Sequence, residues 1–298
     1  MIESFYMNKL ETYSIAKDID YIKEIKKLTN SELASFLNIG EATLYRYYKN
    51  SSNIPYYSLD KIYNYAYENN LKINTIKSHI YEEEYEQKGN IVIYHGSKKG
   101  MIGSKIDLKY SDIDNDFGIG LYCGESITQP ETFVINYPKS SLYMFTFNPK
   151  NLKKIEFKVD TEWVLAIAYY RGYLEKYKNH RYIKRIIEKI NNADYIVAPI
   201  ADNTMFDIIK RFTDGELSDV QCQHSLSATN LGKQYVFKSQ KAIDSLIFLN
   251  KCFISSQERK DLANTILDNK TISENKVNYA ISKYRKEGKS LQELLNDK

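Results

Sequence analysis

Three short segments far apart in the chain carry the residue pattern of buried β-strands, and they constrain the fold more than any other feature of the sequence. Residues 91–94 read Ile-Val-Ile-Tyr and are followed by His-Gly-Ser, so the strand ends next to a glycine. Residues 116–124 contain three glycines around an aliphatic and aromatic core, and residues 234–237 read Gln-Tyr-Val-Phe. Glycine at the end of a strand permits close approach of a ligand or of another backbone. The pattern therefore indicates strands whose ends lie near a bound ligand.

Each segment offers one group that suits ligand binding. Gly96 would let a flat ring lie against the backbone, and Tyr122 offers an aromatic face for stacking. Gln234 both donates and accepts hydrogen bonds, so it can hold a hydroxyl. A lone histidine such as His95 is more often a structural residue, so none of these signals is specific by itself. Residues 116–118 read Asp-Phe-Gly, the tripeptide that binds magnesium in protein kinases. The other kinase motifs do not accompany it here, so the kinase interpretation fails.

Taken in order, these motifs resemble the core of the ADP-ribosyltransferase superfamily, in the branch shared by diphtheria-type toxins and the catalytic domains of poly(ADP-ribose) polymerases. The chain is also similar to a bacterial family of uncharacterised domains in that superfamily. The shared motifs are Tyr94-His95-Gly96-Ser97, Asp116 to Tyr122, Glu162-Trp163, Pro199 to Asn203, and Gln234 to Phe237. The resemblance implies an α+β fold with a split mixed or antiparallel β-sheet, preceded by a small all-α domain that is similar to a helix-turn-helix.

The same resemblance implies cleavage of the nicotinamide glycosidic bond of NAD and transfer of ADP-ribose to an acceptor. By this resemblance His95 would hydrogen-bond a ribose hydroxyl, the Gly96 backbone would bind the carboxamide, and Tyr122 would stack on the nicotinamide ring. The other residues of the implied NAD site are Ser97, Phe117, Gly118 and Phe133, the last of which stands where the polymerases carry a second stacking tyrosine. NAD enters as a substrate, and no metal is expected.

Gln234 departs from the polymerase pattern, in which a glutamate begins this strand and its charge steadies the oxocarbenium ion. A glutamine can bond the ribose but brings no charge and cannot act as a base, so we expect transfer of single ADP-ribose groups. On the same reasoning, glutamate at 234 would preserve or raise NAD cleavage. Asp202 is the first candidate for a second carboxylate, ahead of Asp116 and Glu125. Its alternative role is to cap a helix at 205–210. The expected catalytic set is His95, Tyr122, Gln234 and Asp202.

Residues 1–85 are expected to form a separate helical domain. Thr29 suits the cap of a helix, residues 38–40 suit a tight turn, and a third helix would run from 41 to 49. This spacing resembles the helix-turn-helix of repressor-type DNA-binding domains, whose groove-facing positions would be Glu41, Ala42, Thr43, Tyr45 and Arg46. However, residues 1–87 contain ten Lys and Arg against thirteen Asp and Glu, a net charge of −3, whereas DNA-binding domains usually present a basic face. DNA binding and protein docking therefore stay open as alternatives.

Composition bounds the remaining expectations. With 298 residues, of which 43% are hydrophobic, the chain can bury a large core and divide into domains. We expect the helical domain at 1–85, a catalytic domain at 86–255 and a helical tail at 256–298. No apolar run approaches the roughly 20 residues of a membrane span and no secretory signal begins the chain, which predicts a cytoplasmic protein that does not bind membranes. The three cysteines are scattered and predict neither a disulfide nor a zinc site.

The sequence thus predicts a mono-ADP-ribosyltransferase that acts on a macromolecule, either protein or nucleic acid, as a bacterial toxin or phage-defence effector. An antitoxin or docking protein is a candidate partner. The alternative is a non-catalytic regulator that senses NAD or ADP-ribose through the same fold. The sequence does not identify the acceptor.

Overall fold

The computed structural model describes residues 10–49, 54–103, 105–229 and 231–298. It confirms the α+β class, with a helical N-terminal region followed by strands and further helices. The chain divides into two compact units, and each takes its residues from three separate stretches. Unit 1 comprises Met1–Ile106, Ser126–Asn148 and Leu246–Ile266, and unit 2 comprises Asp107–Glu125, Pro149–Ser245 and Leu267–Lys298. The two units are interleaved along the sequence, whereas the domains expected from sequence follow one another along the chain. The expected domain boundaries at residues 85 and 255 stay a prediction.

The N-terminal part of unit 1 is a bundle of short helices. Its elements are α1 (Ile15–Lys26), α2 (Asn30–Phe36), α3 (Glu41–Lys49), α4 (Tyr56–Glu68) and α5 (Ile73–Glu86). The Thr29 hydroxyl accepts the Glu32 N–H while the Glu32 carboxylate accepts the Thr29 N–H, so the expected cap of α2 is confirmed as a capping box. Asn38 takes a φ of 49° in the tight turn before α3. The exposed face of α3 carries Glu41, Ala42, Tyr45 and Arg46, while Leu44 is buried.

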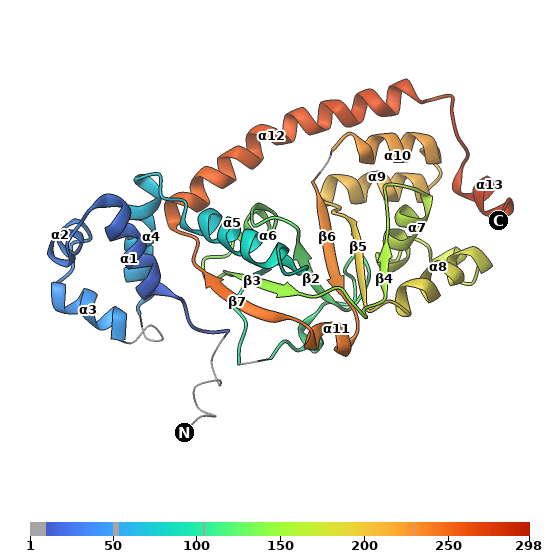
Figure 1. Cartoon of the computed structure of the whole chain (residues 1–298). Helices are drawn as coiled ribbons and strands as arrows, with labels where there is room; N and C mark the ends of the chain where they lie inside the picture. Colours follow the sequence, from blue (N-terminus) through green and yellow to red (C-terminus); the bar gives the residue numbers. More distant parts are fainter. Residues whose placement is uncertain (1–9, 50–53, 104, 230) are drawn as a thin grey trace. The chain divides into compact units, whose positions relative to one another are not determined.

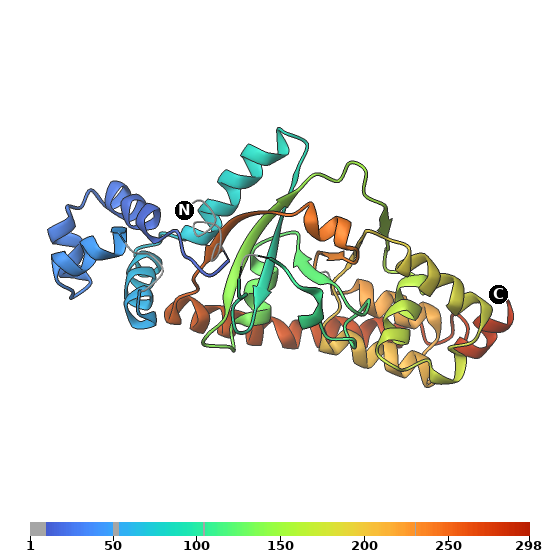
Figure 2. The ribbon, with the colours of Figure 1, turned by 90° about the horizontal axis from the view of Figure 1, so that it is seen from below.

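The strands of unit 1 are β1 (Ile91–Ser97), β3 (Ser141–Phe147) and β7 (Ile247–Cys252). β3 is the central strand and pairs antiparallel with both neighbours, and β1 and β3 run side by side in Figure 2. Helix α6 (Thr128–Val134) contributes Val134 to the buried cluster that includes Tyr94 and Leu142. The expected strand at 91–94 is therefore confirmed and continues through the His-Gly-Ser segment.

Arg259, in the first turns of α12 (Ser256–Lys283), fixes the end of α6. Its side chain is buried, and Nη1 donates to the carbonyl oxygens of Val134, Ile135 and Tyr137 at 3.1 Å each. Nη2 donates to Ser140 Oγ at 3.0 Å. The last carbonyls of a helix have no partner within the helix, and here one guanidinium satisfies several of them. A residue from the third stretch of unit 1 thus holds the second stretch in place.

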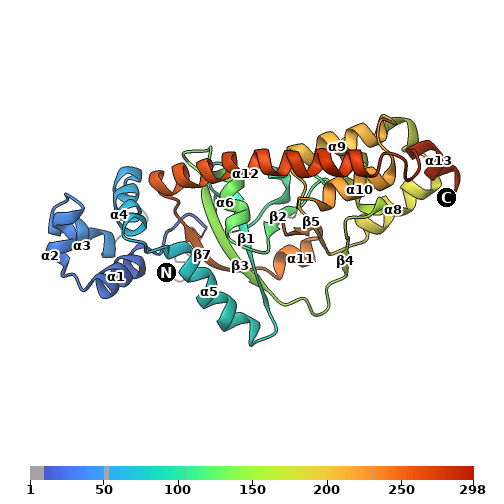
Figure 3. The same ribbon diagram turned by 90° about the horizontal axis from the view of Figure 1, so that it is seen from above.

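Unit 2 has a mixed set of strands, in the order β4 (Lys154–Glu156), β5 (Tyr195–Pro199), β6 (Lys233–Phe237) and β2 (Leu121–Gly124). β4 and β5 are parallel, and the other pairs are antiparallel. The helices are η3 (Leu108–Tyr110), α7 (Thr161–Tyr170), η4 (Glu175–Tyr177), α8 (Arg181–Asn191), α9 (Asn203–Thr213), α10 (Asp219–Ser227), α11 (Gln240–Asp244), the end of α12, and α13 (Leu291–Asn296). Helices α9 and α10 pack side by side in both Figure 1 and Figure 3.

The core of unit 2 forms around α7, which is apolar along nearly its whole length. Trp163 is fully buried, together with Phe212 of α9 and Ile196 of β5. Asp160 caps α7 by accepting the Trp163 N–H at 3.0 Å. Within the described ranges, no helix combines the length and the apolar character needed to cross a membrane.

Candidate active site

The predicted site residues fall into two groups, one in each unit. Unit 1 holds His95, Gly96 and Ser97 at the end of β1 and Phe133 on α6. Unit 2 holds Phe117, Gly118, Tyr122, Asp202 and Gln234.

In unit 1 the glycine of the His-Gly-Ser segment is explained by helix packing. A Cβ on Gly96 would lie 2.8 Å from Val134 Cγ1 and 2.9 Å from the carbonyl oxygen of Pro130, so any side chain would push α6 away from β1. His95 is half-buried and lies opposite Tyr143 in the β1–β3 register, with 6.3 Å between ring centroids. The close approach expected at Gly96 is therefore made by α6 and does not require a bound ring.

Phe133 lies on the surface of α6. Its side chain is 60% exposed, and the Lys98 ammonium lies 5.2 Å from its ring centroid. An exposed aromatic ring can stack on another flat group, so the contact between Phe133 and NAD stays a prediction.

In unit 2 the turn from Asp116 to Gly120 is held by two side chains. The Tyr122 hydroxyl accepts the Phe117 N–H at 2.9 Å and donates to the Gly118 carbonyl oxygen at 2.7 Å. The Lys238 ammonium donates to the carbonyl oxygens of Phe117 and Ile119. Burial lowers the pKa of Lys238 to about 8. The turn is therefore a fixed element, and the Tyr122 hydroxyl is committed to holding it.

Gly118 permits this turn for two reasons. Its φ is 71°, a conformation that side chains disfavour, and a Cβ there would lie 2.7 Å from Cε1 of Tyr170. Tyr122 is half-buried and packs against the core of unit 2. The glycine and the tyrosine of the Asp-Phe-Gly-x-Gly-x-Tyr motif thus define the geometry of the turn.

Phe117 belongs to the core of unit 2, and its assignment as a cofactor contact stays a prediction. Its side chain has 0% exposure and stacks on Phe157 with 5.5 Å between ring centroids. Its N–H is bonded to Tyr122 and its carbonyl oxygen to Lys238. The ring and the N–H of Phe117 are therefore already engaged within unit 2.

Gln234, the first buried residue of β6, has a defined amide orientation. Its Nε2 donates to Asp116 Oδ2 at 3.1 Å and to the carbonyl oxygen of Pro199 at 3.1 Å. Because the carbonyl can only accept, the nitrogen of the amide must face these two groups. Among the described residues, none donates a hydrogen bond to Oε1, so this atom is the part of Gln234 suited to accept a ligand hydroxyl.

Asp116 is 6% exposed and joins Gln234 to Arg171. Arg171 Nη2 donates to Asp116 Oδ1 at 2.6 Å, and the guanidinium stacks on Phe206 with its Cζ 3.8 Å from the ring centroid. Burial raises the pKa of Asp116, while the hydrogen bonds from Arg171 and Gln234 act in the opposite direction. A short ion pair favours the charged form, so Asp116 is a buried carboxylate held by two donors.

The two other carboxylates considered from sequence are bonded to backbone. Asp202 Oδ1 accepts the Met205 N–H at 2.9 Å and caps α9, which confirms the helix-capping interpretation. Glu125 is exposed at the end of β2, and its Oε1 accepts the Lys233 N–H at 2.8 Å. Asp116 is therefore the carboxylate that contacts Gln234, and the catalytic role of Asp202 stays a prediction.

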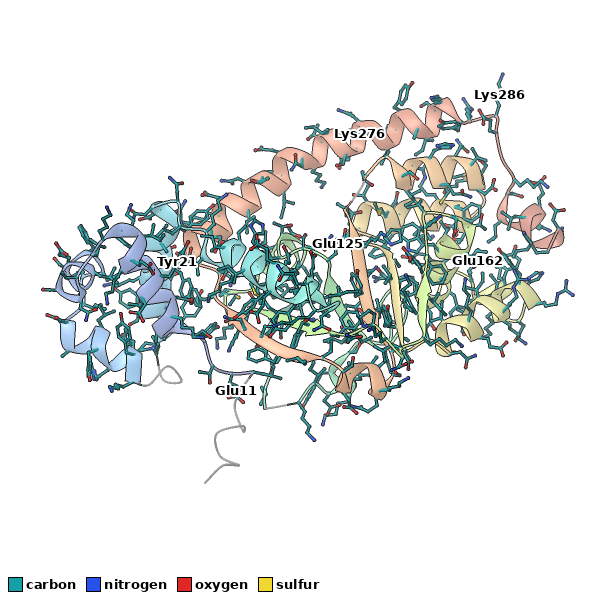
Figure 4. The ribbon with its side chains drawn as sticks, viewed as in Figure 1. Glu11, Tyr21, Glu125, Glu162, Lys276 and Lys286 are labelled. Carbon is teal, nitrogen blue, oxygen red and sulfur yellow. The ribbon has the colours of Figure 1, made fainter. Side chains whose placement is uncertain are left out.

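A separate cavity of about 630 Å³ lies elsewhere in unit 2, near α13. Its walls include Asp160, Glu162, Tyr182 and Lys289 but none of the predicted site residues. Glu162, which is labelled in Figure 4, bonds the Lys189 ammonium at 2.9 Å. The charged side chains that line this cavity already have partners, so the Asp116 turn is kept as the candidate site. Within the described ranges no cluster of three or more His, Cys, Asp or Glu could hold a metal ion.

Comparison with known proteins identifies the family. Residues 91–248 match the model of the family described as Protein of unknown function (DUF3990), and because the match covers more than half of the 298 residues, the chain belongs to this family. The match includes both motif groups and excludes helices α1–α5. No curated protein and no solved structure matches the chain.

Sequence reasoning missed Arg171 and Lys238, which are as important to this site as the motif residues. Arg171 follows directly after α7, and Lys238 follows directly after β6. Their partners lie 55 and 121 residues away in the chain. A cation immediately after a buried helix or strand was the only available signal.

Proposed function

We propose that this protein is a mono-ADP-ribosyltransferase that cleaves NAD and transfers one ADP-ribose group to a macromolecule. The observation that carries the proposal is the orientation of Gln234, whose Nε2 is bonded to Asp116 and Pro199 so that Oε1 is left as an acceptor. A ribose hydroxyl is a donor of the kind that such an atom recognises. The order of the motifs and their resemblance to ADP-ribosyltransferases support the same assignment.

The proposed reaction breaks the bond between ribose C1′ and the nicotinamide nitrogen. The electron pair of that bond leaves with nicotinamide, which becomes neutral, and positive charge develops on the ribose. A nucleophile of the acceptor then attacks C1′ and loses its proton to solvent. Gln234 holds the ribose while its partially negative oxygen faces the developing charge, which lowers the barrier only if the amide is fixed beforehand.

The test is incubation of the full chain and a bacterial extract with biotin-tagged NAD. We expect covalent label on a macromolecule, release of nicotinamide, and a single ADP-ribose per modified site by mass spectrometry. Gln234→Ala should lower the label about 100-fold, because removal of one preorganised group at a charged transition state costs this order of rate. Gln240→Ala is the matched control, since Gln240 is an exposed residue of α11.

Two other outcomes would replace the proposal. Tight binding of NAD with no release of nicotinamide would favour a regulator that senses the nucleotide, and the exposed face of α3 would then be examined for a DNA or protein partner. Failure to bind NAD at all would remove both functions.

A further inference from the structure

Gln234 carries no charge, but its hydrogen-bond partner Asp116 is a carboxylate. Asp116 Oδ2 accepts the Gln234 Nε2–H at 3.1 Å, and both residues are at least nine-tenths buried, with exposures of 6% and 7%. A hydrogen bond is stronger in such surroundings than in water, and donation to a carboxylate polarises the donor amide. The polarisation increases the negative charge on Oε1, the atom left to accept a ligand hydroxyl.

The ion pair with Arg171 favours the charged form of this carboxylate without cancelling its effect on Gln234. Its Nη2 lies 2.6 Å from Asp116 Oδ1, so it bonds the oxygen that Gln234 does not use. The Arg171 side chain is 27% exposed, whereas that of Asp116 is 9% exposed, so solvent screens the cation more than the anion. The negative charge therefore acts on Gln234 more strongly than the positive charge does.

The position of Asp116 is fixed by the turn that follows it. Tyr122 and Lys238 bond the backbone of Phe117, Gly118 and Ile119, and Asp116 directly precedes them. A carboxylate held in this way does not have to reorganise when charge develops nearby, which is the condition for electrostatic stabilisation of a transition state.

We propose that Asp116 is a positioning residue for the reaction and that the Asp116–Gln234 couple replaces the single glutamate that begins this strand in polymerase-like enzymes. The inference rests on the proposed function. Asp116 fixes the amide with Oε1 toward the ribose and supplies, through the amide, the negative charge that stabilises the oxocarbenium ion. The couple differs from a lone glutamate because its carboxylate cannot reach an acceptor as a base, which fits transfer of single ADP-ribose groups.

This arrangement changes the expectation for glutamate at 234. In Gln234→Glu the new carboxylate would face the Asp116 carboxylate and the Pro199 carbonyl oxygen, both of which accept hydrogen bonds and neither of which donates. The expectation from sequence that glutamate preserves or raises NAD cleavage took no account of these neighbours. With them, the single variant should lose activity.

The experiment exchanges the carboxylate at position 116 and the amide at position 234. Nicotinamide release is measured for the wild type, Asp116→Asn, Gln234→Glu, and the double variant Asp116→Asn/Gln234→Glu. We expect each single variant to lower kcat about 10- to 100-fold with little change in KM, and the double variant to return to within about threefold of the wild type, because an amide at 116 can donate to a carboxylate at 234. Asp114→Asn, in the same loop and exposed, is the matched control.

The outcomes separate the inference from the proposed function. A wild type that neither binds nor cleaves NAD removes the proposed function. A wild type that cleaves NAD while Asp116→Asn is equally active overturns the inference alone. A double variant that folds and is no more active than either single variant also overturns it, since a purely structural pair would recover stability without recovering kcat. If Asp116→Asn does not fold, comparison of Gln234→Glu with the double variant decides the matter.

Discussion

The two motif segments have different kinds of support. In unit 1 the His-Gly-Ser segment is shaped by apolar packing, because α6 lies against the bare Cα of Gly96. In unit 2 the Asp116–Gly120 turn is shaped by hydrogen bonds from Tyr122 and Lys238 and by the ion pair with Arg171. Two glycine-containing motifs can therefore be held in place by different interactions, apolar packing in unit 1 and hydrogen bonds in unit 2. Substitutions in the two motifs should accordingly change different measured properties.

The largest expected effect is on stability, at the glycine of the unit 2 turn. Gly118→Ala should cost about 3 to 4 kcal/mol, because it combines the strain of a left-handed conformation with a clash against Tyr170. Gly172→Ala is the matched control, since Gly172 has a φ of 75° and nothing within 4 Å of the added Cβ. It should cost only about 1 to 2 kcal/mol. Chemical denaturation measures both, and equal costs would show that Tyr170 gives way without penalty.

In unit 1, helix α6, which packs against Gly96, carries a buried glutamate. Glu131 of α6 is 4% exposed, and burial, followed by the charge of Glu258, raises its pKa to about 8, while Lys72 acts in the opposite direction. Burial also raises the pKa of Glu258 to about 7. Because these pKa values are raised in the folded state, the contribution of the two groups to stability is fully present at acidic pH and is lost as pH rises through them.

Glu131→Gln should remove part of this loss. The variant should be more stable than the wild type by about 2 kcal/mol at about pH 9, and the difference should shrink toward acidic pH. Thermal unfolding across the pH range is the measurement, with Glu83→Gln as an exposed control on α5. A constant difference at every pH would show that Glu131 does not ionise in the folded protein.

The role of the unit 1 motif in NAD binding is implied by resemblance alone. His95→Ala should weaken NAD binding by roughly 5- to 150-fold, which corresponds to the loss of one hydrogen bond of about 1 to 3 kcal/mol. Isothermal titration measures the affinity, and His79→Ala, an exposed histidine of α5, is the control. Unchanged affinity in a folded His95→Ala protein would restrict ligand recognition to the residues of unit 2.

The smallest expected effect separates the ring of Tyr122 from its hydroxyl. Tyr122→Phe keeps the ring proposed to stack on nicotinamide but removes both hydrogen bonds to the turn. We expect a loss of about 1 to 2 kcal/mol in stability with NAD affinity nearly unchanged. Denaturation and titration of the same sample measure the two quantities. A large loss of affinity would mean that the shape of the turn, and not the ring, determines binding.

Local patterns predicted local structure well. The caps at Thr29 and Asp202 each join residues within a few positions of each other, so the local sequence contains the whole interaction. The strand that begins at Ile91 was predicted from its own run of β-branched residues, although its hydrogen-bond partner is the distant strand β3. The burial of Phe117 could not be predicted, because a motif does not show which side of a turn faces the core. The Arg171–Asp116–Gln234 network could not be predicted, since its members lie 55 and 118 residues apart and meet only through the fold.

The interleaving of the two units has a consequence for biosynthesis. A ribosome makes β1 and β3 early, but β7 and Arg259 emerge only after residues 149–245, which belong to unit 2. Until then the edge of β3 that will pair with β7 is open, and unpaired edges are prone to aggregation and proteolysis. Unit 2 in turn waits for Leu291 and Leu294, which complete its core. A chain interrupted before β7 therefore leaves both units unfinished, whereas a chain interrupted between Ile266 and α13 leaves only unit 2 without part of its core.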